Sequence, residues 1–116
     1  MRCVVLLLIV LGLGFAPAPV FRIRPIPLAG KWSVKFANGV VETCELRANG
    51  RASVAEPARS SGGKAEAEGN AVVITFDDDR IERWSVRGAG VAVEHWFPAS
   101  QYPAGPSVRG SGRRLP

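Results

Sequence analysis

Cys44 and His95 are the two residues of this chain whose types could support nucleophilic chemistry, because a histidine beside a thiol can remove its proton. Alternation along the surrounding segments places both side chains on inward faces, and Glu42 could orient the imidazole. Catalysis requires the base and the nucleophile to approach to about 3 Å. A packed thiol and a rim histidine that never meet are the simpler interpretation. We therefore predict no catalytic residue and no enzymatic activity.

A run of three aspartates, Asp77 to Asp79, offers hard oxygen ligands of the kind that bind Ca²⁺. A calcium loop spreads its ligands over a longer turn, however, and adds backbone carbonyl groups. Consecutive aspartates between two apolar segments are more typical of a hairpin turn, because aspartate tolerates turn geometry. Cys44 and His95 together cannot complete the four ligands of a structural zinc site. We predict no metal site and no cofactor.

Three tryptophans could form a binding site for a planar or apolar molecule. Alternation points Trp32 and Trp84 inward and Trp96 outward, where an exposed indole could mark a contact surface. Small inward residues leave space beside the indole rings, so the interior holds either a ligand pocket or a core that the rings fill. The candidate ligand-binding residues are Trp32, Cys44, Ala52, Ala65, Ala67, Trp84 and His95.

Strands must hold these side chains in place, since the segment from Gly30 to Phe97 alternates apolar and polar residues between short turn signals. Asn38-Gly39 and Asn49-Gly50 are clear signals, because Asn-Gly favours tight hairpins. About seven strands at a spacing of about ten residues indicate an all-β fold. Short sequential connections favour an antiparallel up-and-down meander that forms a small barrel, complete or incomplete.

The same alternation predicts the direction of single side chains. Glu56–Gly63 is expected to be the longest loop, and Lys64–Glu68 is expected to be a strand. The apolar residues expected to face inward beside the tryptophans are Val34, Phe36, Val40, Leu46, Val54, Val72, Ile74, Phe76, Val86, Val91, Val93 and Phe97.

The opening of the first strand, Leu28-Ala29-Gly30-Lys31-Trp32, resembles the calycin superfamily. Lipocalins and avidin-like proteins begin with a glycine, any residue and a tryptophan that plugs one end of the barrel. The resemblance implies that Trp32 closes the barrel floor and that the Glu56–Gly63 loop lies at the mouth, like the lid of avidins. No biotin-binding set of residues matches. Phe36–Cys44 and Glu94–Pro98 also look like parts of small exported planctomycete proteins that lack an assigned function.

The N-terminal segment has the layout of a secretory signal: Met1-Arg2, an apolar run from Cys3 to Phe15, and then small residues. The thirteen apolar residues are short for a bilayer core of about 30 Å. We predict export to the periplasm, the cell envelope or the exterior, with cleavage of the signal or its retention as an anchor as alternatives. The predicted organisation is a signal peptide over 1–18, an extended lead-in over 19–29, a barrel over 30–97 and a disordered basic tail over 98–116.

The net charge of +5 lies in the flanks, because Gly30–Phe97 contains nine basic and ten acidic residues. That distribution argues against nucleic acid as a partner. It favours either contact of the basic tail with an anionic envelope surface or a tail that keeps the protein soluble. The first function hypothesis is an exported, non-enzymatic barrel that binds a small apolar ligand between the strands or under the Glu56–Gly63 loop. The alternative is a structural or protein-interaction module of the cell envelope with a solid core. Neither hypothesis specifies an oligomeric state.

Overall fold

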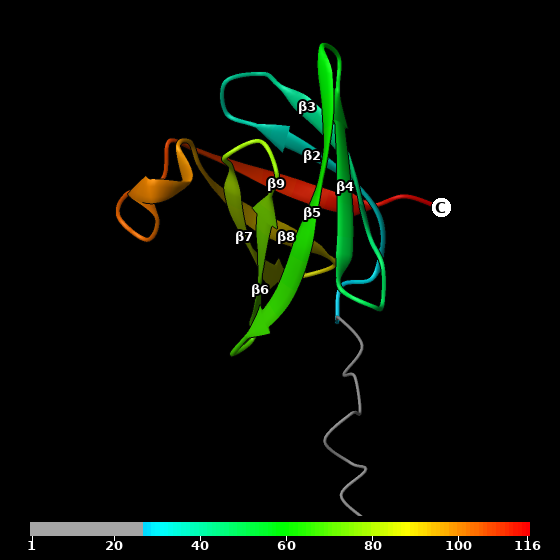
Figure 1. The fold of residues 1–116 in the computed structure, drawn as a ribbon. Helices are drawn as coiled ribbons and strands as arrows, with labels where there is room; N and C mark the ends of the chain where they lie inside the picture. Colours follow the sequence, from blue (N-terminus) through cyan, green and yellow to red (C-terminus); the bar gives the residue numbers. More distant parts are fainter. Residues whose placement is uncertain (1–26) are drawn as a thin grey trace, which may run out of the picture.

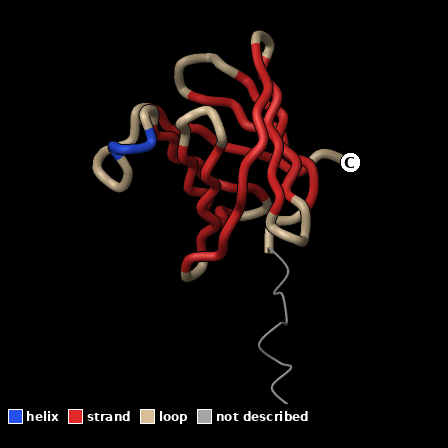
Figure 2. The backbone as a smooth tube through the Cα atoms, viewed as in Figure 1, coloured by secondary structure: helices blue, strands red, loops and turns tan. Residues whose placement is uncertain are grey.

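The computed structural model describes residues 27–116, in which eight antiparallel strands form a closed barrel (Figures 1 and 2). The predicted all-β meander is therefore confirmed, with one strand more than expected and with complete closure. The predicted signal peptide and most of the lead-in lie outside the described residues. In chain order the strands are β2 (Gly30–Phe36), β3 (Val41–Leu46), β4 (Arg51–Glu56), β5 (Arg59–Glu68), β6 (Ala71–Phe76), β7 (Ile81–Arg87), β8 (Gly90–Trp96) and β9 (Val108–Arg114).

The two Asn-Gly turns form as predicted. Gly39 and Gly50 have φ angles of 91° and 92°, which glycine adopts without the steric cost that a side chain would add. The side-chain oxygens of Asn38 and Asn49 each accept a hydrogen bond of 3.0 Å from the backbone N–H two residues later. The local chemistry of these turns therefore sets where β2 and β3 end and where β3 and β4 begin.

The prediction of a disordered C-terminal tail was wrong, because Val108–Arg114 is β9 and closes the barrel between β8 and β2. Its inward positions are glycines, so no apolar alternation marks it in the sequence: Gly110 pairs with Phe36, and Gly112 pairs with Val34. A Cβ atom at Gly110 would lie 2.8 Å from a ring carbon of Phe36. The side chains of neighbouring strands therefore fill the interior beside β9.

Replacing Gly110 with valine is expected to lower the free energy of unfolding by about 1–3 kcal/mol or more, because the new side chain overpacks this closure. Urea denaturation followed by tryptophan fluorescence measures the loss. Gly105→Val is the matched control, since a Cβ atom there meets nothing within 4 Å. Equal effects of the two substitutions would contradict the tight fit at β9.

Trp32 is buried near the start of β2, at the end of the barrel where the described chain begins, which is the position that the resemblance to calycins implied. Its indole N–H donates a 2.8 Å hydrogen bond to the carbonyl oxygen of Leu28. The Arg114 guanidinium lies over the ring, 4.5 Å from the ring centre, and donates to the carbonyl oxygen of Ala29. The floor is thus held by both ends of the described chain.

The centre of the barrel is filled by side chains. Trp32 and Trp84 are at most 2% exposed and meet edge to face, with their ring centres 5.7 Å apart. Indole rings at this spacing occupy the space beside the small residues Ala52 and Ala65, which are also buried. Of the two interpretations of the interior, the geometry favours the solid core.

Three side chains predicted to face inward are instead exposed: Val40, Val86 and Phe97, which lie at strand ends or turns where the barrel opens to solvent. Ala67 is also exposed. The reason is that β4 pairs with β5 only as far as Lys64, so Ala67 has a neighbouring strand on one side alone.

The predicted loop over Glu56–Gly63 is a tight turn, because only Pro57 and Ala58 separate β4 from β5. The expected lid is therefore absent from the described residues. Arg59 to Gly63 lack apolar alternation, yet they pair with β4 through backbone hydrogen bonds. The predicted strand over Lys64–Glu68 is confirmed as part of β5.

Trp96 points out of the barrel, as its parity predicts, but it is only 2% exposed. The connection from β8 to β9, which contains the 3₁₀ helix η2 (Ala99–Gln101), folds back over it. Tyr102 meets the indole edge to face at 4.8 Å, and the indole N–H donates to the carbonyl oxygen of Ala104. Trp96 is therefore not a free contact surface.

Over residues 27–116, no helix is both long and apolar enough to cross a bilayer.

Candidate functional site

The end of the barrel opposite Trp32, which we call the mouth, gathers the tips of the β2–β3, β4–β5 and β6–β7 hairpins (upper end of Figure 1). Four buried polar side chains lie inside or beside it: Glu42, Arg80, Glu82 and His95. Glu42 shares the inward face of β3 with Cys44, and Glu82 shares that of β7 with Trp84. The strands therefore carry ionisable groups into a space that is otherwise apolar.

Arg80 joins three carboxylates from different parts of the chain. Its guanidinium lies 2.7 Å from Glu56, 2.8 Å from Asp78 and 3.7 Å from Glu42, and its side chain is fully buried. It also lies over the ring of Phe76, 5.1 Å from the ring centre. One cation thus links β3, the end of β4 and the β6–β7 turn. The aspartate run forms that turn, as predicted, with Asp78 contacting Arg80.

A second group centres on Glu82, whose two carboxylate oxygens have different partners. Oε1 accepts a 3.0 Å hydrogen bond from the indole N–H of Trp84, and Oε2 lies 3.0 Å from Nδ1 of His95. The imidazole also meets the ring of Phe36 edge to face at 5.4 Å. The suggestion that Glu42 orients the imidazole was therefore wrong, because the adjacent strand supplies Glu82 for that contact.

Glu42 is a neutral acid at pH 7. Burial, followed by the negative charge of Glu82, raises the pKa of Glu42 to about 10. The attraction of Arg80 at 3.7 Å opposes this shift, but the desolvation of a fully buried carboxylate outweighs one distant contact. Among the described residues neither oxygen of Glu42 accepts a hydrogen bond, whereas the protonated acid can donate to Glu82 or Glu56. The proton on Glu42 therefore reduces the repulsion between this acid and the neighbouring carboxylates.

Cys44 is fully buried one inward position from Glu42. Burial raises the pKa of the thiol, and the negative charge of Glu82 raises it further. A protonated thiol is the opposite of what a nucleophile requires. No hydrogen bond joins Cys44 to His95 within residues 27–116. The geometry thus gives no support to a catalytic pair. In the same range no group of three or more His, Cys, Asp or Glu is placed to hold a metal ion.

The hairpin-tip cleft is a hollow of about 580 Å³ between the β2–β3 and β4–β5 turns. Val40 and Val41 line it and are 38% and 43% exposed. Glu56 connects the cleft to the buried network, because one of its oxygens contacts Arg80 and the other accepts a 3.1 Å hydrogen bond from Arg59. The residues lining the cleft are Asn38, Gly39, Val40, Val41, Glu56, Pro57, Ala58 and Arg59.

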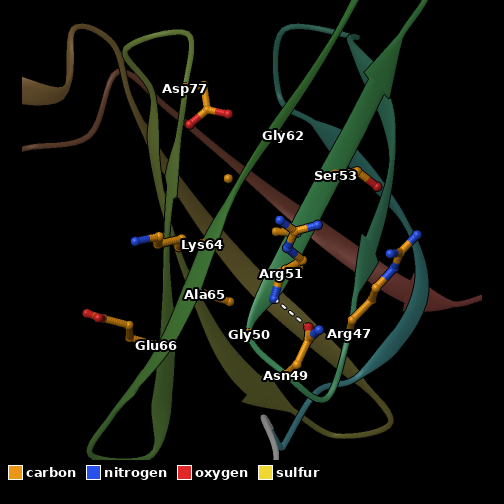
Figure 3. A pocket seen from close by; sticks show the side chains of 12 residues that line it. Arg47, Asn49, Gly50, Arg51, Ser53, Gly62, Lys64, Ala65, Glu66 and Asp77 are labelled. Atoms are coloured by element: carbon orange, nitrogen blue, oxygen red, sulfur yellow. Dashed lines mark hydrogen bonds between the residues drawn. The ribbon is translucent and has the colours of Figure 1, made fainter.

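A second hollow, of about 730 Å³, lies along β4 and β5, and several charged side chains line it (Figure 3). Arg47, Arg51 and Lys64 supply positive charge, and Glu66 and Asp77 supply negative charge. In Figure 3 the side chains of Lys64 and Glu66 point away from Arg47, across the ribbon of β5. Mixed charges without a common focus do not select one ligand.

The structure buries six of the seven predicted ligand-binding residues; five of them belong to the hydrophobic core, and His95 lies beside Glu82 at the mouth. Charged residues at the mouth were missed, although the signal for two of them was present: Glu42 and Glu82 have the same parity as Cys44 and Trp84. The predicted ligand-binding residues that are buried are Trp32, Cys44, Ala52, Ala65, Trp84 and His95.

No known protein family, curated protein or solved structure matches this chain. The small antiparallel barrel is consistent with a calycin-like architecture. Its function must therefore be inferred from the geometry of the mouth and of the outer surface.

Proposed function

We propose that this protein is an exported, non-enzymatic binding module whose hairpin-tip cleft takes a small, uncharged apolar ligand. The cleft carries the proposal: its volume of about 580 Å³ is within the usual size of small-molecule sites, and it leaves two valines partly exposed. Export rests on the apolar N-terminal run followed by small residues.

The charges around the cleft favour an uncharged ligand. Both oxygens of Glu56 are already paired, one with Arg80 and one with Arg59. Burial alone would raise the pKa of Glu56, but the hydrogen bond from Arg59 and the charge of Arg80 outweigh it, so its pKa lies below the usual range. Because both of its oxygens are paired, the Glu56 carboxylate is not free to bind an amine ligand. The valines, Pro57 and Ala58 offer apolar contact.

Of the two expected places for the ligand, between the strands or under the Glu56–Gly63 segment, the solid core favours the second, because Glu56 to Arg59 line the hairpin-tip cleft. The Trp32–Trp84 contact leaves the indoles in contact with protein rather than with a ligand. That same contact favours the second candidate, a structural or protein-interaction module. The two candidates differ in whether the hairpin-tip cleft binds a small molecule.

Replacing Val41 with glutamate is expected to reduce the binding of apolar probes at least tenfold, because a charge in the cleft must be desolvated when a probe enters. Titration with a medium-chain alcohol and an uncharged aromatic dye, followed by amide NMR shifts, should move the signals of Val40, Val41 and Ala58. Val86→Glu is the matched control, since Val86 is 60% exposed at the other end of the barrel.

Absence of shifts at the hairpin tips, or an equal loss in both variants, would reject the cleft as the binding site. Shifts confined to the indole N–H signals of Trp32 and Trp84 would instead indicate that the ligand binds at the barrel centre.

A further inference from the structure

The outer face of β2 and β9 carries a line of basic side chains, which we call the basic ribbon: Lys31, Lys35, Arg109 and Arg113. All four are exposed. The strands pair so that Lys35 lies opposite Ser111 and Arg113 lies opposite Ser33. Basic residues therefore alternate across the pair in a zigzag, with diagonal neighbours about 7–8 Å apart. Closure of the barrel by β9 creates this surface, which neither strand could form alone.

Little acidic charge neutralises the basic ribbon. Arg109 contacts Glu94 at 3.6 Å, and Lys31 lies opposite Glu45. Within residues 27–116, Lys35 and Arg113 form no ion pair. Four acidic side chains that could neutralise positive charge on the outer surface contact Arg80 or His95 at the mouth instead. They are Glu42, Glu56, Asp78 and Glu82. Because these acids are engaged at the mouth, surplus positive charge remains on the outer surface.

We propose that the basic ribbon docks on an anionic lipid bilayer. The membrane contacts that the sequence led us to expect from a loose basic tail are therefore assigned to a rigid strand pair, β2 and β9. Position in the chain favours a bilayer over other polyanions: Lys31 is sixteen positions after Phe15, the end of the apolar run, with Arg22 and Arg24 between them. Each basic side chain near an anionic leaflet adds to attraction. The outer face that carries the ribbon holds lysine, arginine and serine, without an aromatic residue on which a nucleic-acid base could stack.

The inference does not depend on the proposed ligand, but the two sites are neighbours. Lys35 lies directly opposite Val41 in the β2–β3 pair, and Val41 lines the hairpin-tip cleft. Docking through the ribbon would therefore hold the cleft beside the lipid surface.

The test compares two variants of the full chain that lose the same charge: K35Q/R113Q on the ribbon and K64Q/R87Q elsewhere on the barrel. Lys64 and Arg87 are exposed. Co-sedimentation with phosphatidylcholine vesicles that contain phosphatidylglycerol measures the partition coefficient, and circular dichroism confirms that each variant is folded. The ribbon variant is expected to bind roughly 10- to 30-fold more weakly at low salt, while the control changes by less than about threefold.

Three outcomes would overturn the proposal. Equal losses of vesicle binding in both variants would show that binding depends on the net charge of the protein and not on the basic ribbon. Unchanged binding of the ribbon variant would assign vesicle binding to the apolar N-terminal run. Loss of binding to a DNA duplex with unchanged vesicle binding would make nucleic acid the partner. The apolar-probe titration is repeated on K35Q/R113Q, so that failure of the ribbon and failure of the cleft are seen separately.

Discussion

Replacement of Arg80 with methionine is expected to lower the free energy of unfolding by about 3–5 kcal/mol at pH 7. The guanidinium is fully buried, and its removal leaves Glu56 and Asp78 as carboxylates without their shared cation. Methionine keeps the apolar stem and the contact with Phe76, so the loss reports on charge rather than on volume. Urea denaturation at pH 7 measures it.

Arg87→Met, at an exposed position on β7, is the control and is expected to change stability by less than about 0.5 kcal/mol. The deficit of the Arg80 variant should shrink in acid. The pKa of Glu56 is depressed in the native protein, so its contribution is present above the unfolded pKa and is lost as the pH falls through the folded value. A deficit that stays constant from neutral to acidic pH would argue against the ion-pair explanation.

Replacement of Glu42 with glutamine is expected to raise the free energy of unfolding by about 4–5 kcal/mol at pH 8. The pKa of Glu42 rises from 4.5 to about 10 on folding, so between these values the folded protein holds more protons than the unfolded chain. The stabilising effect of that proton is complete below pH 4.5 and disappears as the pH approaches 10. Glutamine is neutral at every pH and can still donate to Glu82.

The stability of the glutamine variant should therefore match that of the parent near pH 4 and exceed it increasingly toward pH 8. Denaturation curves at several pH values test this slope. Glu45→Gln, on the outward side of β3, is the control and is expected to leave the slope unchanged. A glutamine variant that is less stable than the parent at pH 8 would mean that Glu42 is ionised and bound to Arg80.

The two substitutions have opposite expected signs because the two residues play different parts in one network. Arg80 carries the charge that several acids require, whereas Glu42 is one acid more than that charge can satisfy. Glu56 lies between this network and the hairpin-tip cleft. Arg80 therefore also positions a wall of the proposed binding site.

Local sequence patterns were enough to predict most of the barrel. Trp32, Val34 and Phe36 alternate with polar residues, and this period places them on one buried face in any sheet. Asn38-Gly39 and Asn49-Gly50 specify turns through their own side chains and backbone freedom. Both kinds of signal act within a few residues, so they are visible before the chain is folded.

Features that depend on distant partners could not be predicted in this way. Gly110 and Gly112 carry no apolar signal, and β9 exists because Phe36 and Val34 from β2 fill the space beside them. Arg80 resembles any surface arginine until Glu56 and Asp78 surround it.

Trp96 has the parity of an exposed residue, yet the β8–β9 connection covers it. The direction of each side chain thus followed from the local period of the strands. Whether that direction led to solvent, to another side chain or to a buried charge depended on chain segments brought together only when the barrel closes.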